Sequence, residues 1–164
     1  MDPSSLIYAL VFILLLIGSA FFSGSETTFL SLRKTTVKSF SKSKNLSHRQ
    51  VAHLLSDSQK LLISIIIGNT IVNVSVASLA AVLTSRASIR LGVNPALILL
   101  LNVVVVTGVI LFFSEIIPKV SAVRNPRVLA PKLAYPLTFF YYLFYPISVV
   151  FSEITNWLSK SIKT

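Results

Sequence analysis

The sequence contains no cysteine, which excludes disulfide bonds, thiolate catalysis and the cysteine-rich sites that hold structural zinc. Charged residues are also scarce. They make up 12% of the 164 residues, whereas a soluble domain carries roughly 25%. There is no glycine-rich phosphate loop and no Ser-His-Asp set, so nothing in the sequence supports an enzyme. With so few charges, the chain lacks the polar surface that a soluble protein needs.

Long hydrophobic runs take the place of the missing charges. Hydrophobic residues make up 54% of the chain, and the mean hydropathy is +0.80. Three stretches reach the length of about twenty apolar residues that a bilayer core requires: residues 5–32, 61–84 and 96–118. We therefore predict an all-α membrane protein in which residues 1–164 form a single transmembrane domain with three transmembrane helices.

Lysine and arginine are distributed unevenly among the connections. None precedes the first span, and only Arg86 and Arg90 lie between the second and the third. The connection between the first two spans carries seven: Arg33, Lys34, Lys38, Lys42, Lys44, Arg49 and Lys60. The positive-inside rule then predicts an N-terminus outside and a C-terminus inside. The net charge of +10 favours anionic membrane lipids over nucleic acid as the partner.

Two further segments lie on the predicted cytoplasmic side. Residues 33–60 are rich in lysine and serine and are expected to form amphipathic juxtamembrane helices. Residues 131–160 contain three prolines, several tyrosines and Trp157, and they fit either a fourth span or a helix at the interface. We favour the half-embedded interface helix, because prolines and aromatic residues suit that position. A multi-pass protein of a prokaryotic inner or plasma membrane is expected.

Polar residues interrupt each span near its cytoplasmic end. Such residues are costly in a bilayer and usually functional. With a rise of about 1.5 Å per residue, the three spans bring them to about one depth. They are Ser23, Gly24 and Ser25 in the first span, Gly68, Asn69 and Asn73 in the second, and Ser114, Glu115, Pro118 and Lys119 at the end of the third.

Their spacing indicates how these residues can act together. Asn69 and Asn73 are four residues apart and share one helix face. If the third helix continues through Pro118, the carbonyl of Ser114 loses its helical partner, since proline has no N–H. Gly24 permits local unwinding of the first helix. The resulting donors are hydroxyl, amide, carboxylate and backbone oxygens, which suit Mg²⁺ or Ca²⁺ and, less strictly, Na⁺.

Each polar group also has a structural alternative. The asparagines are commonly used to join membrane helices, and the serines can bond to their own helix backbone. Glu26 is better placed to pair with Lys34 or Arg33 than to join the site. Glu115 can pair with Lys119 on the same helix face.

Three motifs carry a family resemblance: "SGSETTFLSL" (23–32), "IGNTIVN" (67–73) and "SEIIPK" (114–119). In this order and spacing, the chain resembles the transmembrane domain of the CorC/cyclin M family of magnesium transporters. The resemblance implies a homodimer that exports Mg²⁺, with Na⁺ as the coupling ion. It places Mg²⁺ among Ser23, Asn69, Asn73, Glu115 and the carbonyl of Ser114, with Ser25 as a further ligand, and gives Pro118 and Lys119 the task of shaping and anchoring the helix end.

The chain departs from the family pattern at Ser114, where members commonly have glycine. The main-chain carbonyl survives that change, but the side chain adds bulk and a hydroxyl. Full-length members continue into paired CBS modules that bind nucleotide, and residues 1–164 contain no such region. Two other functions remain open: a membrane-anchoring and dimerising module without transport, and an exchanger for another cation.

Overall fold

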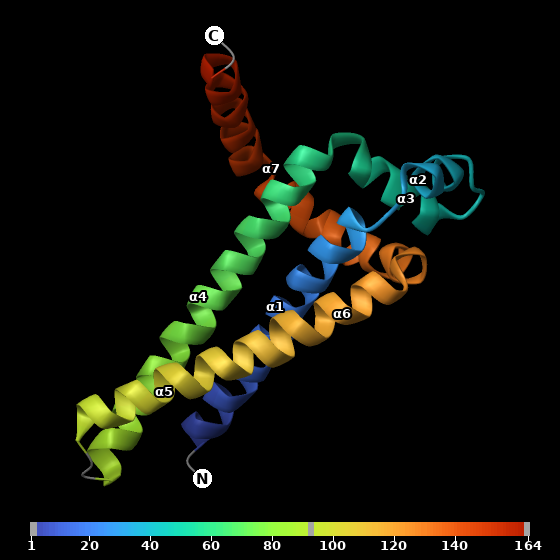
Figure 1. The fold of residues 1–164 in the computed structure, drawn as a ribbon. Helices are drawn as coiled ribbons and strands as arrows, with labels where there is room; N and C mark the ends of the chain where they lie inside the picture. Colours follow the sequence, from blue (N-terminus) through green and yellow to red (C-terminus); the bar gives the residue numbers. More distant parts are fainter. Residues whose placement is uncertain (1–2, 92–93, 163–164) are drawn as a thin grey trace. The chain divides into compact units, whose positions relative to one another are not determined.

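The computed structural model describes residues 3–91 and 94–162, and these residues form helices without any strand, as predicted. Gly92 and Val93, between the second and third predicted spans, lie outside the described residues. The elements (Figure 1) are α1 (Pro3–Leu30), α2 (Lys34–Ser41), α3 (Leu46–Leu54), the 3-10 turn η1 (Leu55–Asp57), α4 (Ser58–Leu91), α5 (Pro95–Val109), the π-helix η2 (Ile110–Ile116), α6 (Ile117–Arg124) and α7 (Pro126–Ile162).

Four helical segments in the described residues are long and apolar enough to cross a membrane. They are Leu6–Leu30, Leu46–Arg86, Ala96–Arg124 and Pro126–Trp157. The fourth covers the segment for which we favoured an interface position. Its length and composition therefore also suit a full span. The expected count of three spans is not confirmed, and the orientation remains a prediction.

The prolines of α7 do not end the helix. The helix contains Pro131, Pro136 and Pro146 and runs on to Ile162. A proline ring holds φ near the helical value, so a helix can continue through it at the cost of one backbone hydrogen bond and a bend. Figure 1 shows the orange and red ribbon of α7 changing direction along its length.

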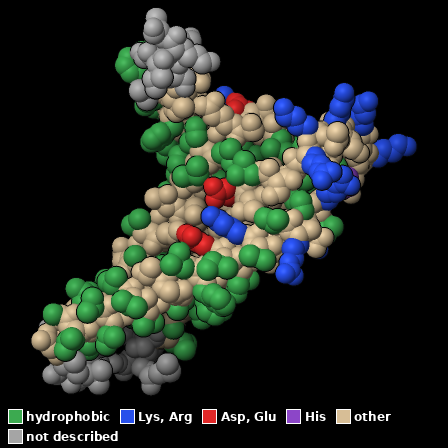
Figure 2. Space-filling view, in the orientation of Figure 1, with side chains coloured by type: hydrophobic (Ala, Val, Ile, Leu, Met, Phe, Trp, Pro, Cys, Tyr) green, Lys and Arg blue, Asp and Glu red, His purple; other side chains and the backbone are tan. Residues whose placement is uncertain are grey.

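Apolar side chains cover much of the surface of the predicted spans. Leu100 and Val104 of α5 are 63% and 64% exposed, and no residue of the most apolar window in Ala96–Arg124 is buried. Figure 2 shows hydrophobic side chains spread along these helices. A surface of this kind is stable only in an apolar solvent, which identifies lipid as the surroundings of these helices.

Two compact units divide the chain. The first comprises Met1–Ser23 and Asn69–Pro118, and the second comprises Gly24–Gly68 and Lys119–Thr164. In the second unit, α3 and the start of α4 pack on α7. Gln50 Nε2 donates to Thr138 Oγ1 at 2.8 Å, and the buried hydroxyls of Ser64 and Ser148 are 2.6 Å apart. These polar contacts lie among apolar side chains and fix the register of the helices.

The juxtamembrane segment forms the two short helices α2 and α3. Asn45 caps α3, because its side chain accepts a hydrogen bond from the Ser47 N–H at 2.9 Å. The ring of Phe40 on α2 stacks on His48 of α3 with centroids 4.2 Å apart. Lysine and arginine side chains gather over this part of the molecule (Figure 2). The two helices thus pack through stacked rings and carry lysine and arginine side chains on their outer surface.

Candidate cation site

In the first unit, α1 and α4 run antiparallel. Near one end, Arg86 Nη2 donates to the hydroxyl of Tyr8 at 3.0 Å, and the guanidinium lies 4.6 Å from the ring centroid. Further along, Ser19 Oγ donates to Asn73 Oδ1 at 2.5 Å. As the residue number rises on α1 it falls on α4, so one turn beyond the Ser19–Asn73 bond Ser23 is level with Asn69.

Ser23 and Asn69 carry oxygen atoms without partners. Ser23 is fully buried and Asn69 is half-buried. Neither Ser23 Oγ nor Asn69 Oδ1 has a hydrogen-bond partner in the described structure. A buried polar group left unsatisfied costs roughly 1–3 kcal/mol, and such groups are rare enough that each needs an explanation. Two of them at one level, on facing helices, are suited to ligating a cation.

Asn73 has a partner, and the bond joins two helices. The packing alternative therefore describes part of its role, since the side chain ties α4 to α1 through Ser19. An amide oxygen has two lone pairs, so Asn73 Oδ1 can accept this bond and still face an ion. Ser19 was not among the predicted site residues. The signal was its position four residues before Ser23, on the same face of the first helix.

The third polar segment lies in the π-helix η2. Ser114 is fully buried, and its hydroxyl donates to the backbone oxygen of Leu16 on α1 at 3.3 Å. Leu16 is one turn before Ser19, so the hydrogen bonds of α1 with η2 and with Asn73 start from neighbouring turns. Ser23, level with Asn69, is one turn further on, and Leu16–Ser23 covers a rise of roughly 10 Å. The structure thus brings η2 and α4 to the same part of α1.

The π-helix itself was not predicted. The Ile117 N–H bonds to the carbonyl of Phe112, five residues back, and the chain then continues as helix through Pro118. Since Pro118 has no N–H, it bonds neither to the carbonyl of Ser114 nor to that of Phe113. π-turns inside helices are frequent at functional sites. The sequence signal for this irregular turn was Pro118, which follows the carboxylate of Glu115 by three residues within a predicted span.

Glu115 is half-buried in η2, and its carboxylate makes no hydrogen bond or ion pair with any described residue. In the second unit, Lys119 Nζ lies 3.9 Å from Glu26 Oε2. The expected pairing of Glu26 with Lys34 or Arg33 is therefore wrong, because Lys119 is its partner. The expected alternative partner of Glu115 is also engaged elsewhere, which leaves the carboxylate available for a cation.

The expected unwinding at Gly24 is wrong. α1 is a continuous helix from Pro3 to Leu30, because an unpaired backbone group in an apolar environment costs more than the roughly 1 kcal/mol by which glycine disfavours a helix. Gly68 is likewise inside α4. In a regular helix, residues two apart point to nearly opposite sides, so Ser25 faces away from the side that carries Ser23.

Ser25 nevertheless has a buried hydroxyl without a partner. So does Thr28, one turn later on the same side of α1, which sequence reasoning did not single out. Both residues belong to the second unit. Whether Ser25 is a ligand stays a prediction.

The donor chemistry is that of hydroxyl, amide and carboxylate oxygens. The described residues contain no group of three or more His, Cys, Asp or Glu side chains placed to hold a metal ion. A zinc or copper centre therefore has no support in residues 3–91 and 94–162, whereas neutral oxygens with a single carboxylate suit a hard cation that is bound modestly.

Comparison with known proteins agrees with the sequence motifs. The family model of the cyclin M transmembrane N-terminal domain matches residues 10–164. The chain belongs to the cyclin M transmembrane domain family. Together with its several membrane-length helices, this makes it a multi-pass membrane protein.

Relatives come from bacteria and plants. The chain is 33% identical to a UPF0053 protein of Haemophilus influenzae over 93% of its own length and 35% of the relative. It is 32% identical to the UPF0053 inner membrane protein YfjD of Escherichia coli, over 88% of its length and 30% of the relative. A chloroplastic DUF21 domain-containing protein of Arabidopsis thaliana is 29% identical over 92% of the chain. The chain thus spans about a third or less of these relatives.

Proposed function

We propose that this cyclin M domain is a secondary transporter that moves Mg²⁺ across the membrane, exporting it in exchange for Na⁺. One observation carries the proposal: Ser23 Oγ and Asn69 Oδ1 are buried without partners at one level of α1 and α4. A cation at that level would supply the missing interactions. The Ser19–Asn73 bond, one turn away, holds the two helices in the register that this requires.

The charges of the proposed ligands make the site bind a divalent ion only modestly. Serine and asparagine oxygens are neutral, and Glu115 offers the single carboxylate. One negative charge does not compensate a divalent ion in an apolar surrounding, so the bound state is not deeply stabilised. Such a site can release its ion to either side, which alternating access around one intramembrane site requires. The wide turn of the π-helix η2 is a place where the third span can exchange its backbone hydrogen bonds while it stays helical.

Assembly and location follow as parts of the same proposal. The chain is expected to act as a homodimer surrounded by lipid. Its expected location is the inner or plasma membrane of a prokaryote, which the inner membrane protein YfjD of Escherichia coli, a relative, supports. Regulation by nucleotide would require a CBS region, which residues 1–164 do not contain.

Flux measurements in proteoliposomes test the proposal. Asn69→Ala and Glu115→Gln are expected to reduce Mg²⁺ flux at least tenfold, because each removes one oxygen donor or the only carboxylate from the site. Asn102→Ala on α5 and Glu153→Gln on α7 are matched controls that remove the same groups elsewhere, and they should retain flux. Unchanged flux in both site variants would reject the assignment. Replacing the Na⁺ gradient with a K⁺ gradient tests the coupling ion.

The anchoring alternative is favoured by one contact, the interhelical Ser19–Asn73 bond. It predicts that Asn73→Ala weakens assembly while the protein shows no Mg²⁺ binding at all. Calorimetric titration of the purified protein with Mg²⁺ and with Ca²⁺ separates this alternative from transport, and it also separates Mg²⁺ from exchange of another divalent cation.

A further inference from the structure

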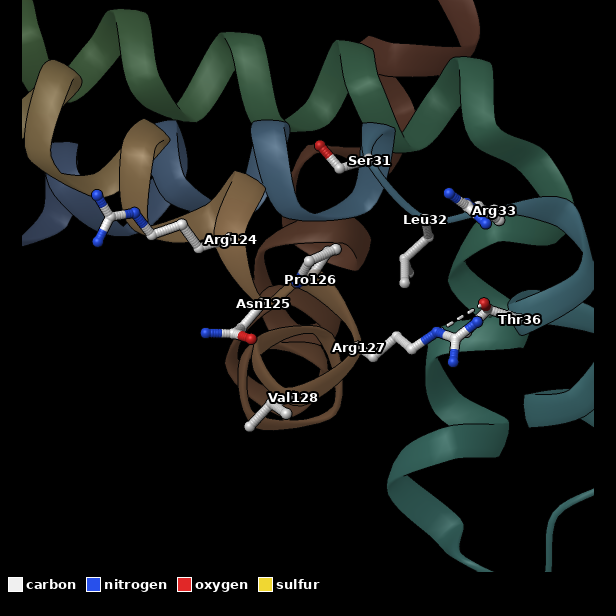
Figure 3. A pocket seen from close by; sticks show the side chains of 9 residues that line it. All are labelled: Ser31, Leu32, Arg33, Thr36, Arg124, Asn125, Pro126, Arg127 and Val128. Carbon is white, nitrogen blue, oxygen red and sulfur yellow. Dashed lines mark hydrogen bonds between the residues drawn. The ribbon is translucent and has the colours of Figure 1, made fainter.

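A cavity of about 500 Å³ lies between two chain junctions of the second unit. The α1–α2 junction contributes Ser31 to Arg33 and Thr36, and the α6–α7 junction contributes Arg124 to Val128 (Figure 3). Three of the lining side chains are arginines: Arg33, Arg124 and Arg127. No aspartate or glutamate lines the cavity. Its walls therefore carry positive charge without a compensating carboxylate.

Two of these arginines, Arg33 and Arg127, lie on the same side of the cavity, whereas the side chain of Arg124 extends away from them (Figure 3). All three side chains are exposed, and none forms an ion pair with another described residue. Arg127 Nε donates to the hydroxyl of the buried Thr36 at 3.1 Å, which holds this side chain against the opposite junction and leaves its two Nη groups unused (Figure 3). Arg127 is thus oriented before any ligand arrives, which lowers the entropy cost of binding.

Two helix starts add to the positive potential of the cavity. α2 begins at Lys34, directly after Arg33, and α7 begins at Pro126. Arg33, the N-cap residue of α2, makes no side-chain capping bond. The first N–H groups of a helix have no partner within it, and the helix dipole places partial positive charge there. Both helix starts therefore reinforce the attraction that the arginines exert on an anion.

The position of the cavity along the chain indicates which anion it meets. The first candidate span ends at Leu30, the third ends at Arg124 and the fourth begins at Pro126. All the lining residues therefore lie within a few positions of the end of a membrane-length helix. That is where a chain passes from hydrocarbon to lipid headgroups, whose phosphates stand at high local concentration. Guanidinium groups bind phosphate oxygens in pairs, which makes arginine the preferred residue for this purpose.

We propose that this cavity binds a phosphate group, supplied by the headgroup of an anionic lipid, through Arg33 and Arg127, while Arg124, whose side chain extends away from these two (Figure 3), adds positive charge at the edge of the cavity. The bound headgroup would fasten the α1–α2 junction to the α6–α7 junction. This proposal concerns a different set of residues from the cation site and does not depend on which ion is transported.

Binding measurements on the purified 164-residue chain in neutral detergent test the proposal. The probes are short-chain phosphatidylglycerol, short-chain phosphatidylcholine, sodium phosphate and a glutamate-rich peptide, each titrated by calorimetry. The test variant carries Arg33→Gln, Arg124→Gln and Arg127→Gln. The matched control carries Lys42→Gln, Lys44→Gln and Arg49→Gln, which removes three exposed charges from the same unit but none from the cavity.

Phosphatidylglycerol is expected to bind at least tenfold more tightly than phosphatidylcholine. The arginine variant should lose that difference, and the control should change by less than about twofold, because bidentate arginine–phosphate bonds require particular side chains whereas diffuse attraction does not. Arginine-dependent binding of sodium phosphate as tight as that of the lipid would support the site with soluble phosphate as its source. If the triple variant cannot be purified, Arg33→Gln made singly should weaken phosphatidylglycerol binding severalfold, and Arg124→Gln, which removes a charge only from the edge of the cavity, should weaken it less.

Three results would overturn the proposal. Equal loss of binding in the arginine variant and in the control variant with Lys42, Lys44 and Arg49 replaced would show that only overall charge matters. No difference between the two lipids would show that no headgroup is selected. Tighter, arginine-dependent binding of the glutamate-rich peptide would show that the cavity receives an acidic protein segment instead of phosphate.

Discussion

Replacing Ser23 with alanine should stabilise the ion-free protein, whereas the same change at Ser19 should destabilise it. Both serines are fully buried on the same face of α1. They differ in their partners: Ser19 Oγ donates to Asn73 at 2.5 Å, while Ser23 Oγ has no partner in the described structure. Alanine fills nearly the same space as serine. The two variants therefore isolate the effect of one hydroxyl, satisfied in one case and unsatisfied in the other.

The expected magnitudes follow from these contacts. Removing an unsatisfied buried hydroxyl recovers its desolvation cost, roughly 1–3 kcal/mol. Removing the Ser19 hydroxyl loses an interhelical bond, worth about 0.6–1.7 kcal/mol in membrane proteins. For a chain of this size, 1 kcal/mol corresponds to about 2–4 °C in Tm. Ser23→Ala should therefore raise Tm by several degrees, and Ser19→Ala should lower it by a few.

Thermal unfolding in detergent, with and without Mg²⁺, measures both effects. An ion present at a hundred times its Kd stabilises the folded protein by about 2.7 kcal/mol. Ser23→Ala should lose most of this ion-dependent increase in Tm because it removes a ligand, and Ser19→Ala should retain most of it. A lower Tm for ion-free Ser23→Ala, or an undiminished response to Mg²⁺, would refute the view that Ser23 is kept unsatisfied in order to bind a cation.

Two further changes test the neighbouring elements. Pro118→Ala supplies the missing N–H to the helix after η2, so it should add about 1 kcal/mol or more to the free energy of unfolding and thereby raise Tm. It should also weaken Mg²⁺ binding in the same calorimetric titration; unaltered binding would separate the π-turn from the site. Glu26→Gln breaks a partly exposed 3.9 Å ion pair with Lys119, so it should change stability by less than about 1 kcal/mol and leave Mg²⁺ flux intact, and a large loss of flux would instead place Glu26 in the site.

Part of the candidate site could be read from the sequence because polar residues in a membrane span are conspicuous. Asn69 and Asn73 were identified by their depth and by a spacing that puts them on one face, and Ser23 by its place at the end of an apolar run. Ser19 was missed, since a lone serine in a span most often bonds to its own helix. Only the antiparallel register of α1 and α4 reveals that it meets Asn73.

The errors have a common physical origin. Glycine and proline both disfavour a helix interior, but α1 is continuous through Gly24 and α7 through its three prolines. Inside an apolar solvent every broken backbone hydrogen bond is costly, so a helix keeps its bonds wherever it can. The partner of Glu26 was sought among its neighbours in sequence, whereas Lys119 comes from the far end of the third predicted span.

The amino-acid sequence by itself determined that this protein is helical, that lipid is the surroundings of its helices and that oxygen donors stand within its spans. These properties follow from composition and from short-range periodicity, which need no knowledge of contacts. Tertiary structure alone decided which of those donors are engaged. Ser19 satisfies Asn73 while Ser23 and Asn69 stay unpaired, and three arginines from two distant junctions share one cavity. Such pairings depend on the register between helices, to which residues far apart in the chain contribute together.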